Sequence, residues 1–210
     1  MSEASNTDPT QADPNPCPFL RALVSRGAIS GEREPLGHLS STIASVFTDP
    51  KKKPVITAAV YQLALTGSGM HPRQILQNKT KGLAVSSLRE GPLDKRGVGS
   101  RILDQTGRAD VEQIDRLDEF ASDYRSPDGE TTERGLNAEE LVTFMDANFE
   151  RGKPDRRHID RKLMDGEWPV LLEVMGKESP DGLYLSLAEV RTLVVERQLP
   201  DRVTRLLHSA

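Results

Sequence analysis

The chain has 210 residues, of which 36% are hydrophobic and 29% charged, and this composition can form one globular domain, or two very small ones, with a sizeable core. A net charge of −4 and a sequence pI of about 5.7 argue against a general nucleic-acid-binding surface, so we expect no nucleic-acid partner. No apolar run approaches the ~20 residues that a membrane-spanning helix needs, so we expect no membrane span.

The N-terminal segment 1–13 is polar and acidic, and it has neither the basic region nor the apolar stretch of a signal peptide. It is predicted to be a disordered tail, followed by a single domain over residues 14–210. Cys17 is the only cysteine, which excludes an intramolecular disulfide. A reducing, cytoplasmic location is therefore expected.

Apolar residues recur at helical spacing along most of the chain. Pro18 suits the first position of a helix and Gly27 suits a C-terminal stop. Asn137 and Ser186 are each followed three residues later by glutamate, the pattern of a helix-capping box, and Pro169 predicts a kink inside its helix. The expected helices are, in chain order, 18–26, 36–47, 54–66, 71–79, 109–122, 136–149, 156–175 and 186–199.

Two segments differ from the rest of the chain in composition. Residues 54–66, PVITAAVYQLALT, are nearly all apolar and predict a buried helix, with a strand as the alternative because Val and Ile are frequent. Residues 81–108 mix Gly, Pro and charge without a long period, and they predict a loop with short elements. Since no strand pattern is convincing, the predicted fold class is all-α, a compact helical domain.

The tetrapeptide SPDG occurs twice, at 126–129 and 179–182, each time between two predicted helices. This arrangement is reminiscent of paired calcium-binding helix–loop–helix units of the EF-hand type. Neither copy, however, places a carboxylate at the first or last position of a calcium loop when its glycine stands sixth. Simple polar turns in two degenerate units are therefore favoured over calcium sites.

Cys17 lies between Pro16 and Pro18 at the start of the first predicted helix. An inert, buried cysteine is the ordinary expectation for a single thiol. Here, the helix start would place free backbone N–H groups near the sulfur and stabilise a thiolate, while the two prolines would hold it in place. Such a thiolate suits a metal ligand better than a nucleophile, because no histidine stands in a recognisable cysteine–histidine pattern.

A single protein thiolate is sufficient for haem iron, whereas zinc or an iron–sulfur cluster needs more ligands. The segment PCPFLRALVSRGAI, residues 16–29, resembles the proximal motif of the fungal chloroperoxidase and unspecific peroxygenase family of haem-thiolate enzymes. The likeness covers the Pro-Cys-Pro, the short helix and the glycine turn, and extends more faintly over about residues 14–203. It implies haem b ligated through Cys17, with Pro16 and Pro18 framing the ligand.

The resemblance also implies a catalytic glutamate that moves a proton between the two oxygens of hydrogen peroxide. Glu167, in GEWPVLLEVMG, is the preferred match and Glu173 the competitor. His158 or Arg161 would be the partner that orients it.

The family further uses an acidic triplet to hold magnesium beside the haem. Only Asp104 persists here, so it is a tentative second-metal ligand and magnesium is doubtful. The missing secretory leader is a second departure, because the fungal enzymes are exported.

The sequence thus predicts a peroxidase or peroxygenase-like protein that uses hydrogen peroxide to oxidise a small apolar or aromatic substrate. Two alternatives stay open. One is a non-catalytic binding or scaffold protein with the two degenerate helix–loop–helix units, and the other is a haem sensor or carrier.

Overall fold

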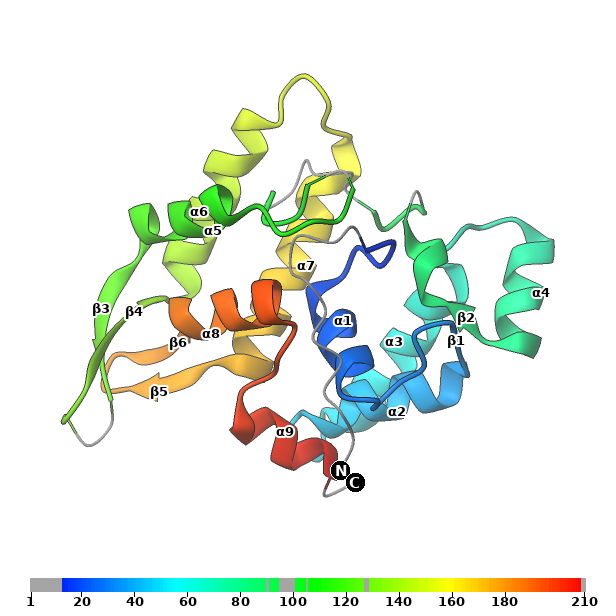
Figure 1. Cartoon of the computed structure of the whole chain (residues 1–210), viewed down its shortest axis with the longest axis horizontal. Helices are drawn as coiled ribbons and strands as arrows, with labels where there is room; N and C mark the ends of the chain where they lie inside the picture. Colours follow the sequence, from blue (N-terminus) through cyan, green and yellow to red (C-terminus); the bar gives the residue numbers. More distant parts are fainter. Residues whose placement is uncertain (1–12, 90, 95–100, 105, 127–128, 209–210) are drawn as a thin grey trace. The chain divides into compact units, whose positions relative to one another are not determined.

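The structure is a computed structural model that describes residues 13–89, 91–94, 101–104, 106–126 and 129–208 (Figure 1). The expected disordered tail, apart from Asp13, therefore lies outside the described residues. The chain divides into two compact units. The first unit comprises Met1–Asp94, Thr106–Arg108 and Arg197–Ala210, and the second comprises Lys95–Gln105 and Ala109–Glu196. Whether 14–210 forms a single domain stays a prediction.

The first unit is mostly helical, with one short two-stranded antiparallel sheet among its described residues. Its core includes Ala22 and Leu23 of the first helix and Leu39 of the second, all almost inaccessible to solvent. The C-terminal helix α9, which the sequence analysis did not predict, contacts α2. The elements are α1 (Pro18–Ser25), β1 (Arg33–Glu34), α2 (Leu36–Ser45), α3 (Lys53–Thr66), α4 (Pro72–Lys81), β2 (Leu83–Ala84), the 3-10 helix η1 (Val85–Leu88) and α9 (Asp201–His208).

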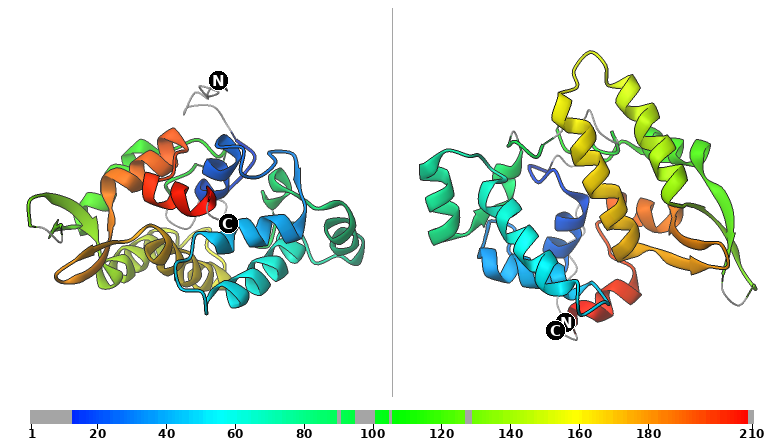
Figure 2. Two further views of the ribbon diagram at one scale, coloured as in Figure 1. Left: turned by 90° about the horizontal axis from the view of Figure 1, so that it is seen from below. Right: turned by 180° about the vertical axis from the view of Figure 1, so that it is seen from behind.

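The helix predicted for 54–66 is present as α3, but its expected burial is wrong. Only Ala64 is buried in α3, while Val55 and Leu63 are more than half exposed. The helix packs against α2 and α4, as the right-hand view of Figure 2 shows. Those two neighbours cover one side of α3 and leave an apolar side open.

The second unit contains a four-stranded antiparallel sheet in the order β3-β4-β6-β5, so the predicted all-α fold class is wrong. Each hairpin of this sheet lies between two helical segments, which makes two consecutive helix–hairpin–helix units (Figure 1). The elements are α5 (Val111–Asp115), the 3-10 helix η2 (Arg116–Phe120), β3 (Ser122–Arg125), β4 (Thr132–Leu136), α6 (Ala138–Arg151), α7 (His158–Met175), β5 (Lys177–Ser179), β6 (Gly182–Ser186), α8 (Leu187–Arg191) and the π-helical turn η3 (Thr192–Glu196).

The first SPDG segment stands between the antiparallel strands β3 and β4, and the second joins β5 to β6, so neither stands between two helices. Gly129 and Gly182 both have positive φ, the backbone conformation that favours glycine. Pro127 and Asp128 of the first copy lie outside the described residues. The strands next to these turns have only three to five residues, which is too short for alternation of apolar and polar side chains to reveal them.

The two hairpins join through β4 and β6, where Gly135 pairs with Ser186 and Leu136 with Leu185. Beside this junction the rings of Tyr124 and Tyr184 stack with their centroids 4.5 Å apart. A Cβ on Gly135 would overlap the Tyr184 ring. Glycine is therefore required at this position for the two hairpins to approach each other.

The predicted capping residues are found at the starts of two helices. Asn137 accepts from the backbone N–H of Glu140, whose side chain accepts from the N–H of Asn137, which completes the predicted capping box. Ser186 caps α8 by accepting from the N–H of Glu189. The helix α7 continues through Pro169 to Met175. In the described part of the chain, no helix combines the length and apolar character that crossing a membrane requires.

Candidate functional site

Cys17 occupies the predicted position at the start of α1. It is the N-cap residue, with extended backbone angles, and Pro18 is the first helical residue. The helix ends at Ser25, and Gly27 follows with a φ of +70°. The Cys17 side chain makes no capping hydrogen bond to the helix, and the residue is partly exposed.

The backbone of Cys17 is held on both sides. Its N–H donates to Asn15 Oδ1 at 3.0 Å, and its carbonyl accepts from the N–H of Arg21 at 3.1 Å. The N–H of Asn15 in turn donates to Asp13 Oδ1 at 2.8 Å. With Pro16 and Pro18 restricting two more φ angles, the chain before α1 has one defined path.

Arg21, one turn into α1, is a buried cation of this region, as is Arg197. The Nε of Arg21 donates to the carbonyl oxygen of Asn15 at 2.6 Å, and its Nη1 donates to that of Gly107 at 2.6 Å. Nη2 donates to the carbonyl oxygen of Asp13 at 3.1 Å. The guanidinium thus fastens the segment before α1 and the segment 106–108 to the same helix.

Electrostatics around Arg21 favour negative charge nearby. Burial lowers the pKa of the Arg21 guanidinium to about 10, opposed by the Asp13 carboxylate, while Arg197 and Arg89 lower it further. A Cys17 thiolate acts in the opposite direction and raises the pKa of Arg21, which means that the two charges attract. A helix start and several arginines are the kind of environment that stabilises thiolates.

A cysteine sulfur is the donor type that a haem held by one protein thiolate would need. Cys17 supplies one such sulfur, on a partly exposed residue whose backbone N–H is held by a hydrogen bond at a helix start. A cavity beside α1 does not provide this sulfur with a ligand pocket. It measures about 210 Å³, below the ~300–1,000 Å³ of ordinary ligand pockets, and Cys17 is not in its lining. That lining is polar and charged, with Asp13, Arg21 and Arg197 among its residues.

The two candidate glutamates lie on α7 of the second unit. Glu167 and Glu173 are both exposed, and neither lines the cavities described in this section. Arg161, a proposed partner, donates to Asp146 at 2.8 Å and also pairs with Asp165. His158 is the exposed first residue of α7. The acid–base role of Glu167 stays a prediction.

Asp104 is half-buried and follows Leu103, which forms an isolated antiparallel bridge with Ala109. Within the ranges that the structure describes, no three His, Cys, Asp or Glu side chains gather into a group that could hold a metal ion. Within the described residues, the fold therefore brings no group of further ligands to Asp104. Its role as a ligand of a second metal stays a prediction.

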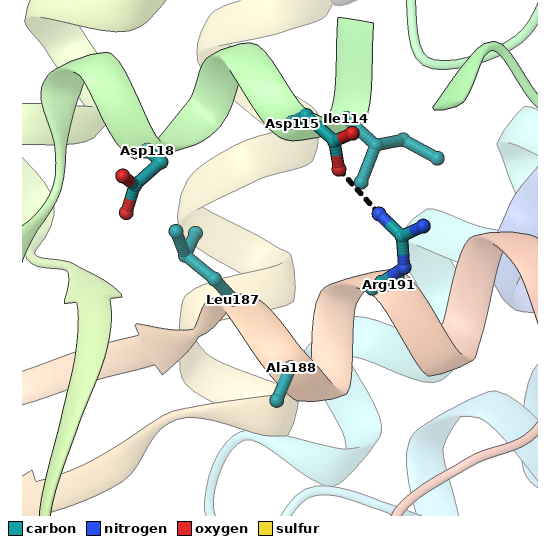
Figure 3. A pocket seen from close by; sticks show the side chains of 6 residues that line it. All are labelled: Ile114, Asp115, Asp118, Leu187, Ala188 and Arg191. Atoms are coloured by element: carbon teal, nitrogen blue, oxygen red, sulfur yellow. Dashed lines mark hydrogen bonds and ion pairs between the residues drawn. The ribbon is translucent and has the colours of Figure 1, made fainter. Parts of the chain in front are cut away.

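The second unit has a shallow cavity of about 330 Å³ between η2, α5 and α8 (Figure 3). Asp115 and Arg191 face each other across it and form an ion pair, while Leu187 points into the space between the helices. Asp118, at the other end, accepts from Arg134 Nε at 2.7 Å. The carboxylates of Asp115 and Asp118 are therefore both paired with arginines. The cavity offers no two carboxyl groups in different environments, one to act as general acid and the other as general base.

Glu133 on β4 is a polar centre that the sequence analysis missed. It accepts from Tyr184 Oη at 2.8 Å, from Ser186 Oγ at 2.8 Å and from Lys177 Nζ at 2.5 Å. Burial raises the pKa of Glu133, but the hydrogen bonds from these three side chains outweigh burial and lower the pKa overall. The residue ties the second hairpin to the first.

No local signal marks Glu133, since its three partners are more than forty residues away along the chain. Only the pairing of β4 with β6 brings them together. Its neighbour in the first hairpin, Tyr124, donates to Glu140 Oε2 at 2.7 Å. Burial and that hydrogen bond raise the pKa of Tyr124, and the group is a structural donor rather than a titrating one.

Comparisons with known proteins identify no relative: no family model, no curated protein and no solved structure matches the chain.

Proposed function

We propose that this protein binds haem b through the thiolate of Cys17 and belongs with peroxide-dependent oxidising proteins of the chloroperoxidase and peroxygenase type. The observation that supports the proposal is the position of Cys17: a partly exposed N-cap cysteine, one turn from a buried arginine, in a Pro-Cys-Pro segment. The resemblance of residues 16–29 to the family's proximal motif gives the proposal its reaction class.

The residues around Cys17 each have a task in this proposal. Asn15 fixes the backbone N–H of Cys17, and Pro16 and Pro18 restrict the chain on either side. Arg21 supplies positive charge one turn away and favours the anionic form of the sulfur. A haem held there would supply the peroxide chemistry, and the sulfur of Cys17 would be the residue group that holds it.

Glu167 is proposed to carry the proton between the two oxygens of hydrogen peroxide, with Glu173 as the competitor on the same helix. The substrate class is a small apolar or aromatic molecule, and the setting is the reducing cytoplasm that a single cysteine favours. Both glutamates are exposed on α7, so each can be replaced by glutamine without disturbing the core.

The test begins with haem titration of the full chain. Reduced, haem-loaded protein treated with carbon monoxide is expected to show the red-shifted Soret band of a thiolate ligand, and Cys17→Ala is expected to lose it. Haem binding that is identical in the Cys17→Ala variant would remove the proposed ligand. Since Cys17 makes no capping hydrogen bond, the substitution is expected to leave the far-UV circular dichroism spectrum unchanged.

The second step measures peroxide consumption by the loaded protein. Glu167→Gln is expected to lower the rate about 10²–10⁴-fold, the usual contribution of a general acid–base group, while Glu173→Gln serves as the matched control. Loss only with Glu173→Gln would move the role to that residue. If neither variant changes the rate while haem stays bound, the sensor or carrier function replaces the enzyme.

The second candidate function is a non-catalytic binding or scaffold protein. It is favoured by the repeated helix–hairpin–helix architecture of the second unit, in which the pairing of β4 with β6 joins the two hairpins. Failure of the full chain to take up haem would favour this candidate, because its architecture needs no cofactor.

A further inference from the structure

The outward side of α3 is apolar at helical spacing. Val55, Ala59 and Leu63 follow one another at intervals of four residues and share one face with Ala58, and all four are exposed. The opposite side of the helix carries the buried Ala64. A helix on a protein surface normally turns its apolar stripe inward, whereas α3 carries apolar side chains on both sides and leaves one of these sides open.

Exposed apolar side chains also follow α3 along the chain. Met70, in the turn after it, and Leu76, on α4, are 73% and 61% exposed, while Val55 and Leu63 are 67% and 51% exposed. These four are the most exposed large apolar side chains of the described residues, and all lie between positions 55 and 76. Clustered exposure of this kind marks an interaction surface. We call it the α3–α4 surface.

The charge of this segment has the opposite sign to that of the whole chain. Residues 49–82 contain six Lys or Arg and one Asp, a net charge of +5, whereas the rest of the chain has 22 Lys or Arg and 31 Asp or Glu, a net charge of −9. Lys51 and Lys52 are exposed just before α3, and Arg73, Lys79 and Lys81 are exposed on α4.

Across the described ranges, Lys51, Arg73, Lys79 and Lys81 form no ion pair. Their charges are therefore available to an anionic partner.

We propose that the α3–α4 surface docks on an anionic lipid membrane, with α3 lying in the interface plane. Apolar side chains flanked by lysine and arginine are what an interfacial helix requires: the apolar stripe enters the headgroup boundary while the cations remain at the phosphates. The attachment is peripheral, consistent with the lack of a spanning helix in the described residues. Symmetric self-association through this surface is disfavoured, because it would bring two patches of the same charge together.

The experiment is co-sedimentation of the full chain with vesicles of phosphatidylcholine, with and without a minor fraction of phosphatidylserine. Binding is expected only when phosphatidylserine is present. It is expected to weaken when the ionic strength rises from ~0.1 M to ~1 M, since the Debye length falls from about 10 Å to about 3 Å. Absence of binding to the anionic vesicles would overturn the proposal.

Two double variants separate the apolar and the charged contributions. Val55→Gln/Leu63→Gln is expected to weaken binding roughly tenfold or more through lost apolar burial. Its matched control, Val142→Gln/Val170→Gln, changes two other exposed valines, on α6 and α7, and is expected to bind as the unmodified chain does. Arg73→Gln/Lys79→Gln is expected to weaken binding on the order of tenfold or more, at about fivefold per basic residue. Lys162→Gln/Arg125→Gln removes two exposed charges of the second unit as its control.

Sedimentation velocity without vesicles completes the test. If the unmodified chain self-associates and Val55→Gln/Leu63→Gln makes it monomeric, the surface is a protein interface and the lipid proposal fails. If both test variants bind vesicles as tightly as their controls, the proposal fails as well. Because the charge variant alters only exposed positions on α4, it remains informative even if the apolar variant reduces the stability of α3.

Discussion

Each unit contains a charged side chain that joins segments far apart in the sequence, but the partners of the two charges differ in kind. Arg21 in the first unit is 3% exposed and donates to three backbone carbonyls. Glu133 in the second unit is partly exposed and accepts from three side chains on β5 and β6. The first charge fastens irregular segments to a helix, and the second fastens two hairpins to each other.

This difference determines how each unit should respond to mutation. When Arg21 is replaced, the backbone carbonyls that it bonds stay in place and lose their donor. The full cost in unfolding free energy of leaving these groups unsatisfied therefore appears in a single substitution. Around Glu133 the interaction is shared among side chains that keep partial access to water. The first centre is therefore expected to be far more sensitive than the second, and three predictions test that order.

The largest effect is expected from Arg21→Met. The substitution keeps a long side chain but leaves the carbonyls of Asn15 and Gly107 without their donor and Asp13 without one of its two cations. The free energy of unfolding should fall by about 4 kcal/mol. Urea unfolding followed by circular dichroism measures this change.

Arg26→Met, at the exposed C-cap of the same helix, is the control and should stay within about 0.5 kcal/mol of the unmodified chain. Equal effects of the two substitutions would mean that the Arg21 hydrogen bonds contribute little net stability.

A smaller effect is expected from Gly107→Ala, compared with Gly27→Ala in the same unit. Both glycines have positive φ, which costs an alanine about 1–2 kcal/mol. A Cβ at 107 would also overlap the carbonyl oxygen of Asp13 and lie 2.7 Å from Arg21 Nη2, whereas a Cβ at 27 meets nothing within 4 Å. We expect losses of about 3 and about 1 kcal/mol in thermal or urea unfolding. A Gly107→Ala variant no less stable than Gly27→Ala would contradict the close approach of segment 106–108 to Arg21.

The smallest effect is expected from Glu133→Gln, and it should depend on pH. The folded-state pKa of Glu133 lies below its ordinary value of 4.5, so its contribution is fully present above pH 4.5 and is lost as the pH falls through the lowered pKa. The difference in unfolding free energy between the unmodified chain and Glu133→Gln should be about 2 kcal/mol at neutral pH and should shrink below pH 4.5.

Unfolding curves across this pH range measure the difference. Glu178→Gln, at an exposed position of β5, is the control and should change stability by less than about 0.5 kcal/mol. A difference that grows on acidification would reverse the assigned direction of the Glu133 pKa shift.

The region around Cys17 shows which features of the proposed site can be predicted from neighbouring residues in the sequence. That Cys17 begins α1 and that Gly27 follows its end could be predicted, because prolines and glycines act on the backbone of their immediate neighbours. The hydrogen bonds of Arg21 could not be predicted, since Gly107 lies 86 residues away. The cofactor, the glutamate and the reaction stay predictions for the experiments above.

The sequence by itself determined where most helices begin and end, because caps, prolines and helical spacing are local properties that need no partner. Asn137 with Glu140 is the clearest example. Only the tertiary structure decided which segments become strands and which helix faces are buried. Strands as short as Lys177–Ser179 exist through hydrogen bonds to a neighbouring strand. The apolar helix α3 stays exposed because α2 and α4 cover only one of its sides, and burial, unlike helix formation, depends on what packs against the surface.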